Sequence, residues 1–359
     1  MVPFMRKKSV IITASIILLL ITAISIYLLQ NKKKDNPTPA SDFVAEDYFI
    51  YDTIVRVKVF GENANEQTLT DIGNLLHDLD NKMNKNKVGS EIDQINAAAG
   101  ESAVKVSPDL FELISRSVQY GDETSGFFDI AIGPLVDLWQ IGNEGAHVPK
   151  QNEINTAMAL TSYKDIELNK QEHSVKLLRK GMVLDLGGIG KGYAAEQIRD
   201  YLLKHDLTSA LINMGSSSII TVGKKLNGSD WLLGIQNPDQ SRGNSLGTIT
   251  LNNEVINTSG VYERFFMQDG VRYHHIFDPQ TGYPIQNGLE SVTIIGKDAV
   301  EAEALTKGIF VMGVDKGLKY IEGLDGVEAL FITKDQKIHA TSGLKNRLNI
   351  TDTNYKVIY

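Results

Sequence analysis

The sequence predicts an α+β domain that follows an N-terminal apolar segment. Strand-like and helical stretches are interspersed along the chain without a regular βαβ period, which favours α+β over a doubly wound sheet. Over 359 residues, 42% are hydrophobic and 22% are charged, the balance of an ordinary globular protein. An apolar stretch close to the N-terminus divides the chain into an anchor and a body.

The apolar stretch runs from Ser9 to Leu29, 21 residues dominated by Ile, Leu, Val and Ala. A helix of this length crosses a hydrocarbon core of about 30 Å. It exceeds the apolar region of a cleaved signal peptide, about 7–15 residues, so we expect residues 1–30 to form a membrane anchor, with a cleaved signal as the alternative. Residues 31–42 are polar and contain proline, as linkers do. Residues 43–359 are expected to form one compact body, with two lobes as the alternative.

Charge and cysteine content restrict the partners and the location of this body. The chain carries a net charge of −8, yet its first 34 residues hold six basic and no acidic residues, which leaves −14 on the remainder. A body this acidic is a poor ligand for nucleic acid. Basic residues flank both ends of the apolar segment equally, so they do not fix its orientation. The absence of cysteine excludes disulfides, thiolate metal sites and a cysteine nucleophile, and it favours an extracytoplasmic body. With the one apolar segment, this predicts a single-pass protein of the cell membrane whose body is extracytoplasmic.

Hydrophobic periodicity predicts the elements of the body in order. Tyr48–Phe60 alternates in β-branched and aromatic residues and is predicted to be a strand, whereas Glu66–Asn84 has the Leu and Ile spacing of a helix. Ser107 with Pro108 starts a helix that runs to about Tyr120. The later predicted elements are a helix at Lys191–Lys204 and strands at Ser209–Met214, Leu232–Gln236, Gly247–Leu251, Val292–Ile295 and Val327–Thr333.

A glycine-rich segment, DLGGIGKG at Asp185–Gly192, lies between a strand-like run at Met182–Leu184 and the helix that begins near Lys191. Glycines allow close backbone approach, and the N-terminus of the helix offers N–H groups to a phosphate. Lys191 adds a positive charge. The segment is not a Walker A loop, because Asp185 and Gly192 stand where that loop needs Gly and Ser or Thr. A turn that serves only tight packing is the alternative.

Ser, Tyr, Arg, His and Asp side chains gather in two neighbouring segments, NTSGVYERF at Asn257–Phe265 and YHHIFDPQTGYP at Tyr273–Pro284. Arg264 suits bidentate binding of a phosphate, and a histidine near an aspartate suits removal of a proton from a hydroxyl. His274 and His275 are adjacent, and neighbouring residues of a strand face opposite sides. We therefore expect at most one of them to enter a site, and a structural histidine pair is the alternative.

Two further segments have a clear pattern. AEALTKGIFVMG at Ala302–Gly313 has helical composition and places Glu303 and Lys307 one turn apart. A solvated pair is one reading, but the apolar setting makes a lone carboxylate costly unless it binds a cation. SGFFDIAIGPLVDLW at Ser125–Trp139 is expected to pack in the core, with a flat ring-binding wall as the alternative.

From about Asp47 to Leu348 these motifs resemble those of the ApbE-type flavin transferases. Five segments follow the order of that family: FIYDT, SGFFDIAIGPLVDLW, DLGGIGKGYAAE, TSGVYERF with HHIFDPQTGYP, and AEALTKGIFVMG. The resemblance implies a Mg²⁺-dependent enzyme that transfers FMN from FAD to a Thr or Ser hydroxyl of an extracytoplasmic acceptor protein and releases AMP. Hydrolysis of FAD to FMN and AMP is the nearest alternative, and a non-catalytic flavin-binding protein is another.

The resemblance also implies roles for single residues. His275 would be the base, helped by Arg264, while Gly188 and Glu303 would bind the metal. The residues implied in binding FAD are Tyr51, Asp129, Asp185, Gly190, Lys191, Ser259, Tyr262, Arg264 and His275.

This chain departs from the family pattern at the metal site and in one turn. Glu303 replaces an Asp, and Lys307 replaces a Thr four positions later. A protonated lysine cannot ligate a metal, so Thr306 or a water is expected to take that place. Ser216 replaces the second Gly of the family's Asn-x-Gly-Gly, so backbone approach there is expected to be less close.

Overall fold

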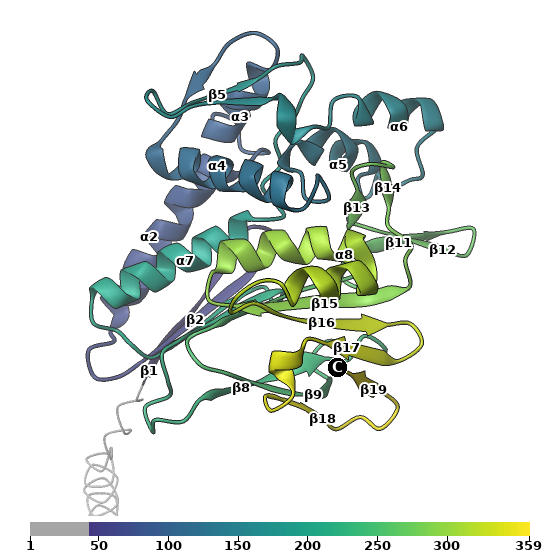
Figure 1. Ribbon diagram of the computed structural model, residues 1–359. Helices are drawn as coiled ribbons and strands as arrows, with labels where there is room; N and C mark the ends of the chain where they lie inside the picture. Colours follow the sequence, from purple (N-terminus) through teal and green to yellow (C-terminus); the bar gives the residue numbers. More distant parts are fainter. Residues whose placement is uncertain (1–42) are drawn as a thin grey trace, which may run out of the picture. The chain divides into compact units, whose positions relative to one another are not determined.

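A nine-stranded sheet forms the centre of the computed structural model, which describes residues 43–359 (Figure 1). Adjacent strands in it are antiparallel, apart from the parallel pair β17 and β19. In spatial order its strands are β1 (Phe43–Ile50), β2 (Thr53–Phe60), β6 (Ala210–Met214), β7 (Ser218–Val222), β10 (Val255–Gly260), β15 (Leu289–Gly296), β16 (Glu328–Thr333), β17 (Lys337–Ala340) and β19 (Lys356–Ile358).

Smaller sheets, hairpins and helices surround this sheet. Two three-stranded sheets contain β18 (Leu348–Ile350), β9 (Ser245–Leu251) and β8 (Trp231–Gln236), and β3 (Val104–Lys105), β5 (Ser174–Leu177) and β4 (Ile166–Asn169). Two hairpins consist of β11 (Phe265–Gln268) with β12 (Val271–His274), and β13 (Phe277–Asp278) with β14 (Tyr283–Pro284). The α-helices are α2 (Glu66–Met83), α3 (Glu91–Ala97), α4 (Pro108–Glu123), α5 (Gly133–Trp139), α6 (Gln151–Met158), α7 (Gly190–Lys204) and α8 (Ala299–Ile321), and the 3₁₀ turns are η1 (Ile130–Ile132), η2 (Tyr163–Asp165) and η3 (Ser342–Leu344).

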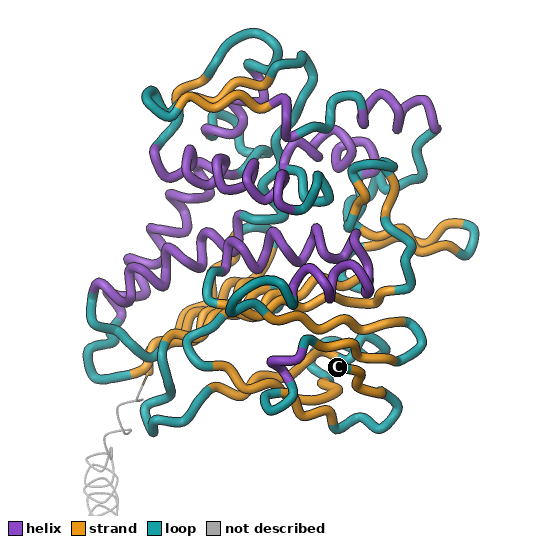
Figure 2. The backbone as a smooth tube through the Cα atoms, in the orientation of Figure 1, coloured by secondary structure: helices purple, strands orange, loops and turns teal. Residues whose placement is uncertain are grey.

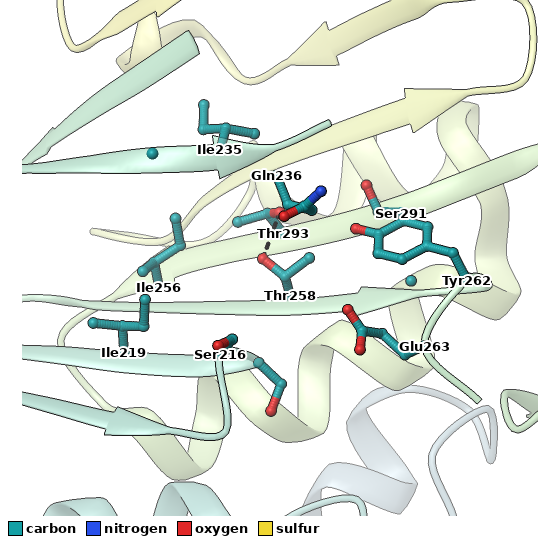
Figure 3. A pocket seen from close by; sticks show the side chains of 13 residues that line it. Ser216, Ile219, Ile235, Gln236, Ile256, Thr258, Tyr262, Glu263, Ser291 and Thr293 are labelled. Atoms are coloured by element: carbon teal, nitrogen blue, oxygen red, sulfur yellow. Dashed lines mark hydrogen bonds between the residues drawn. The ribbon is translucent and has the colours of Figure 1, made fainter. Parts of the chain in front are cut away.

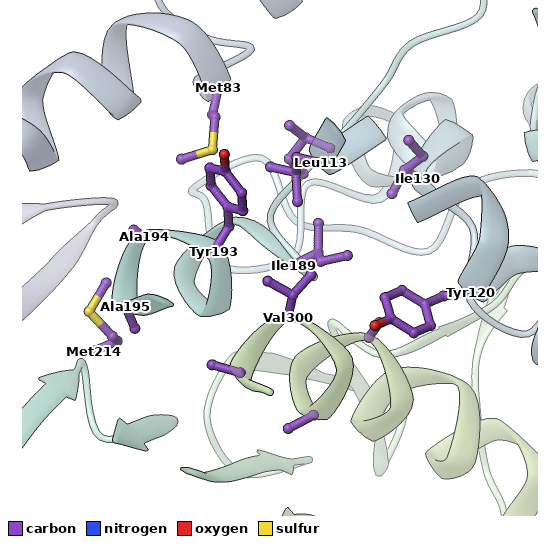
Figure 4. Close-up of a cluster of buried hydrophobic side chains, with 14 of the residues drawn as sticks. Met83, Leu113, Tyr120, Ile130, Ile189, Tyr193, Ala194, Ala195, Met214 and Val300 are labelled. Carbon is purple, nitrogen blue, oxygen red and sulfur yellow. The ribbon is translucent and has the colours of Figure 1, made fainter. Parts of the chain in front are cut away.

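The elements stack in layers around two apolar cores. Helices α7 and α8 cover one face of the large sheet, and the β18-β9-β8 sheet covers the other (Figures 1 and 2). On the helical side, Ile189 and Tyr193 pack with Val300 and Leu113 (Figure 4). A separate cluster that includes Trp231 fills the space under the smaller sheet. Both faces of the central strands are thereby removed from water, and the described residues form one compact unit.

Most of the predicted elements are confirmed, but the prediction of one continuous strand at Tyr48–Phe60 is wrong. The structure has a hairpin there, β1 and β2, joined by Tyr51 and Asp52 in the left-handed conformation with φ of 56° and 54°. Two-residue hairpin turns with such conformations usually carry Asn-Gly, Asp-Gly or Gly-Gly. Tyr51-Asp52 is none of these pairs, and Asp52 alone is a weak local sign that the strand reverses.

The strand-like run at Met182–Leu184 is also not a strand. The side chain of Asn96 bonds both the N–H and the carbonyl of Leu184, at 2.7 and 3.1 Å. A side chain therefore satisfies groups that a neighbouring strand would otherwise pair.

The predicted anchor and linker, residues 1–42, lie outside the described residues. Within residues 43–359, no helix combines the length and apolarity that crossing a membrane requires.

Candidate functional site

A cavity of about 190 Å³ lies where the glycine-rich segment, the block before α5, the ends of the β11-β12 hairpin and α8 meet. One part of its wall is apolar and the other carries charged or proton-accepting groups. The apolar residues are Phe127, Phe128, Ile132, Val136, Ile141, Ile276, Phe277 and Pro279. The polar part and the two loop glycines are Asp129, Asp185, Gly187, Gly188, Arg264, His275 and Lys307.

The Ser125–Trp139 block contributes to both the core and the cavity. Leu135 and Trp139 are fully buried, whereas Phe127, Ile132 and Val136 line the cavity. The sequence predicted core packing for this segment, with a ring-binding wall as the alternative. Leu135 and Trp139 pack in the core as expected. Phe127, Ile132 and Val136 form an apolar wall on which a planar ring could lie.

Lys307 and Arg264 are the cationic side chains of the cavity wall. The ammonium of Lys307 donates a hydrogen bond to Ser259 Oγ at 2.6 Å. Burial, together with the charge of Lys191, lowers the pKa of Lys307 to about 8 despite the opposing effect of Glu303. At pH 7 the side chain is still mainly protonated. The guanidinium of Arg264 has no ion-pair partner within residues 43–359, so its donors are free for an anion.

His275 lines the cavity, and its neighbour His274 does not. Nδ1 of His275 lies 3.3 Å from the carbonyl oxygen of Arg264. Because a carbonyl only accepts, Nδ1 carries the proton and Nε2 is left as a free acceptor in the neutral ring. Burial, followed by the charge of Lys307, lowers the pKa of His275 to about 3. The ring is therefore neutral at physiological pH, and the lone pair of Nε2 is available as an acceptor.

Both ring nitrogens of His274 have partners inside the protein. Nε2 lies 2.8 Å from the carbonyl oxygen of Ile285, and Nδ1 accepts the N–H of Ile276 at 3.3 Å. The residue is 3% exposed, and burial lowers its pKa to about 4. His274 is a structural residue of the hairpin end.

Glu303 is 1% exposed and has a partner for each carboxylate oxygen. Oε1 lies 2.7 Å from the ammonium of Lys191, and Oε2 accepts the N–H of Gly192 at 2.6 Å. The interpretation of Glu303 and Lys307 as a solvated ion pair is therefore wrong. The cation that compensates the buried carboxylate of Glu303 is Lys191. The contact also uses one N–H of the first turn of α7, a group that was expected to be free for a phosphate.

The donor set around Glu303 does not fit a divalent cation. Mg²⁺ prefers several oxygen ligands, chiefly carboxylates, phosphates and water. No group of three His, Cys, Asp or Glu residues able to hold a metal occurs within residues 43–359. Thr306, the expected substitute ligand, is buried, does not line the cavity, and donates its hydroxyl to the carbonyl of Ala302. The side chains of Lys191 and Lys307 carry charge of the same sign as the metal.

The two aspartates of the cavity wall hold backbone in place. Asp129 accepts the N–H groups of Ala131 and Tyr163, at 2.7 and 2.9 Å, and burial still raises its pKa to about 6. Asp185 accepts the N–H of Gly187 at 2.8 Å and lies 3.4 Å from the ammonium of Lys85. The turn of the glycine-rich segment is thereby tied to α2 and α5.

Lys191 does not line the cavity, and neither do four other expected site residues. The hydroxyl of Tyr51 donates to the carbonyl of Leu76 at 3.0 Å, and Gly190 begins α7 with its N–H on Leu186. Ser259 touches the cavity only through its bond with Lys307.

Tyr262, the fourth of these, lines a second cavity of about 60 Å³ between β10 and β8 (Figure 3). There its ring lies near Ser291, and the hydroxyls of Thr258 and Thr293 bond each other at 2.9 Å. Side chains of a strand alternate between faces, so Ser259 points toward α8 while its neighbour Thr258 points toward this second cavity. Tyr262, which the resemblance implied in binding FAD, therefore lines a different cavity from His275 and Arg264.

Comparison with known proteins shows the family to which the chain is related. The model of the ApbE family matches residues 51–331. The chain belongs to the ApbE family. A Klebsiella pneumoniae FAD:protein FMN transferase is 39% identical over 273 residues, covering 76% of this chain and 84% of that protein. A Treponema pallidum protein of the same name is 32% identical, covering 84% and 88%.

Solved ApbE structures share the fold. The ApbE protein of Thermotoga maritima superposes with a TM-score of 0.78 at 31% identity, covering 85% of this chain and 99% of that one. The apo flavinyl transferase ApbE of Pseudomonas stutzeri gives 0.75 at 26% identity, covering 85% and 96%.

Sequence reasoning missed two contributors to this ApbE site. Lys85, which follows α2, reaches Asp137 and Asp185, but nothing in its neighbourhood of the sequence marks it. The wall residues Ile276 and Phe277 follow His275 directly and read as ordinary strand residues. Their position next to His275 was the only available signal.

Proposed function

We propose that this chain transfers FMN from FAD to a Thr or Ser hydroxyl of an acceptor protein and releases AMP. The names of its ApbE relatives support the activity. The structural observation that carries it is a neutral imidazole, His275, with a free Nε2 in the same cavity as Arg264 and Lys307. A base beside two cations suits phosphoryl transfer to a hydroxyl, in which protein groups chiefly position and neutralise charge.

In this reaction the hydroxyl oxygen of the acceptor attacks the FMN phosphorus in line with the bond to AMP. Nε2 of His275 accepts the hydroxyl proton as the new P–O bond forms. The old P–O bond breaks with its electron pair remaining on AMP. Arg264 and Lys307 neutralise the phosphate oxygens, and the wall that includes Phe127 holds a planar ring of FAD. No step is routed through a metal, because the donor set around Glu303 does not fit one.

The test is incubation of the full chain, in detergent, with FAD and the extracytoplasmic proteins of the source cells. Transfer gives a fluorescent protein band that survives denaturation, and mass spectrometry places FMN, less one water, on a Thr or Ser. Release of FMN and AMP without a labelled protein would favour FAD hydrolysis instead. Binding of FAD without any AMP release would favour a non-catalytic flavin-binding protein.

We also propose that residues 1–30 anchor the chain in the cell membrane and that the body lies on the extracytoplasmic side, beside its acceptor. The length of the Ser9–Leu29 segment and the absence of cysteine support this placement. A C-terminal alkaline phosphatase fusion should be active, since that enzyme needs an oxidising compartment to form its disulfides. An inactive fusion in a chain that is stably expressed would contradict the proposed orientation.

A further inference from the structure

Two lysines and one glutamate form a connected group beside the cavity. Lys191 lies 2.7 Å from Glu303 Oε1 and 3.3 Å from the carbonyl oxygen of Gly187. Lys307, one helical turn beyond Glu303, reaches Ser259 Oγ at 2.6 Å and lines the cavity. Gly188 connects the group to the glycine-rich segment, since a Cβ there would lie 3.7 Å from Cγ of Lys307.

The charge of this group equals that of a carboxylate with a divalent cation. One carboxylate and two ammonium groups sum to about +1, as one carboxylate and one Mg²⁺ would. Adding Mg²⁺ to both lysines would bring about +3 to a site with a single acid, whose two oxygens are already bonded. Glu303 does not line the cavity wall, and the two carboxylates that do, Asp129 and Asp185, are engaged with backbone N–H groups and, for Asp185, with Lys85.

We propose that the ammonium of Lys307, with Lys191 already paired to Glu303, supplies the positive charge that a divalent cation would otherwise bring to the diphosphate of FAD, so that this chain works without bound metal. The inference rests on the proposed function and concerns the charges that assist it. The ammonium of Lys307 contacts the oxygen that leaves with AMP and stabilises its negative charge as the P–O bond breaks. Lys191 does not line the cavity but compensates the charge of Glu303, so that the charge of Lys307 remains available to the diphosphate.

The first experiment compares FAD binding and AMP release by the full chain in EDTA and in a titration of Mg²⁺. Mn²⁺ binding, measured by electron paramagnetic resonance, gives a readout that does not depend on activity. We expect the Kd for FAD and the rate of AMP release to differ by less than about threefold between EDTA and Mg²⁺, and no bound Mn²⁺. A tenfold loss in EDTA that Mg²⁺ restores, together with stoichiometric Mn²⁺ binding, would overturn the inference.

Variants of Lys307 make the test specific. Lys307 contacts a neutral hydroxyl, so Lys307→Met leaves no buried carboxylate unpaired and should fold. We expect it to weaken FAD binding about 10–100-fold with or without Mg²⁺. Lys307→Thr supplies an oxygen ligand and should gain Mn²⁺ binding and a dependence on Mg²⁺. Lys316→Met removes the same charge from an exposed position of α8 and serves as the matched control. If Lys307→Met behaves like the control, Lys307 does not act on the diphosphate.

Failure of the inference differs from failure of the proposed function. Activity that requires Mg²⁺ would overturn the metal-free site and leave FMN transfer intact. The chain could instead bind FAD without metal but release no AMP, whichever protein of the extracytoplasmic pool is offered as acceptor. That result would retain the lysine site and overturn the transfer.

Discussion

The backbone N–H of Gly192 lies 2.6 Å from Oε2 of Glu303, a residue 111 positions further along the chain. The contact joins the first turn of α7 to the first half of α8. It requires glycine, because a Cβ at position 192 would lie 2.3 Å from the carbonyl oxygen of Ala299. This close helix approach brings Lys191 to Glu303 and so assembles the charged side of the site.

Gly192→Ala should therefore lower the free energy of unfolding. An added methyl group in a tightly packed contact commonly costs about 1–3 kcal/mol, because backbone has to move. Urea denaturation measures the loss. Gly190→Ala is the matched control in the same helical turn, since its added Cβ meets nothing nearer than 3.9 Å and alanine favours helix. Equal losses in the two variants would show that the contact with Ala299 is not the cause.

His275→Gln should slow the transfer while FAD still binds. The imidazole takes a proton and does not hold the flavin, and loss of a general base commonly costs about 10²–10⁴ in rate. AMP release measures the rate, and flavin fluorescence measures the Kd for FAD. The comparison variant is His274→Gln, because both ring nitrogens of His274 are bonded within the protein. A slow His274→Gln beside a fast His275→Gln would reverse the assignment.

His274 should make the fold less stable as the solution becomes acidic. Burial lowers its pKa to about 4, against an ordinary value of 6.5, so between these values the unfolded chain binds a proton that the folded protein does not. The neutral ring's contribution is complete above about pH 6.5 and is lost progressively as the pH falls toward 4, by about 3 kcal/mol in total. Urea denaturation at pH 7.5 and pH 5 should show a steeper decline for the wild type than for His274→Gln. Parallel declines would contradict the low pKa.

Asp129→Asn should destabilise the wall of the cavity. Both carboxylate oxygens accept backbone N–H groups, from Ala131 and Tyr163, and an amide can accept only through one atom. One buried N–H would then face an NH₂ group, at a cost of about 1–3 kcal/mol. Thermal unfolding of Asp129→Asn and of Asp137→Asn, a change at a more exposed carboxylate of α5, measures the difference. A loss no larger than in the control would show that the two N–H bonds contribute little.

Local patterns were enough to predict the family, the longer helices and several strands, but not the short helices α3, α5 and α6 or most of the other strands. The helices at Glu66–Met83, Pro108–Glu123 and Gly190–Lys204 follow from hydrophobic spacing and helix-start residues. The hairpin turn at Tyr51 and Asp52 was not predicted, because its two left-handed residues do not form one of the usual pairs Asn-Gly, Asp-Gly or Gly-Gly. Residues of the site were found where the chemistry lies in one motif, as with His275 and Arg264. Lys85 was missed because its partners are distant in the sequence.

The sequence by itself determined the apolar segment, the main elements of the body, the ApbE motifs and the unusual Glu303 and Lys307. These properties depend on residue type and on spacing over a few turns. Only the tertiary structure decided which histidine enters the cavity, that Tyr262 faces another cavity, and that Lys191 is the cation beside Glu303. Each of these depends on which groups packing brings within about 3 Å and on which hydrogen bonds remain free there. Such contacts join residues up to more than a hundred positions apart, so no local pattern specifies them.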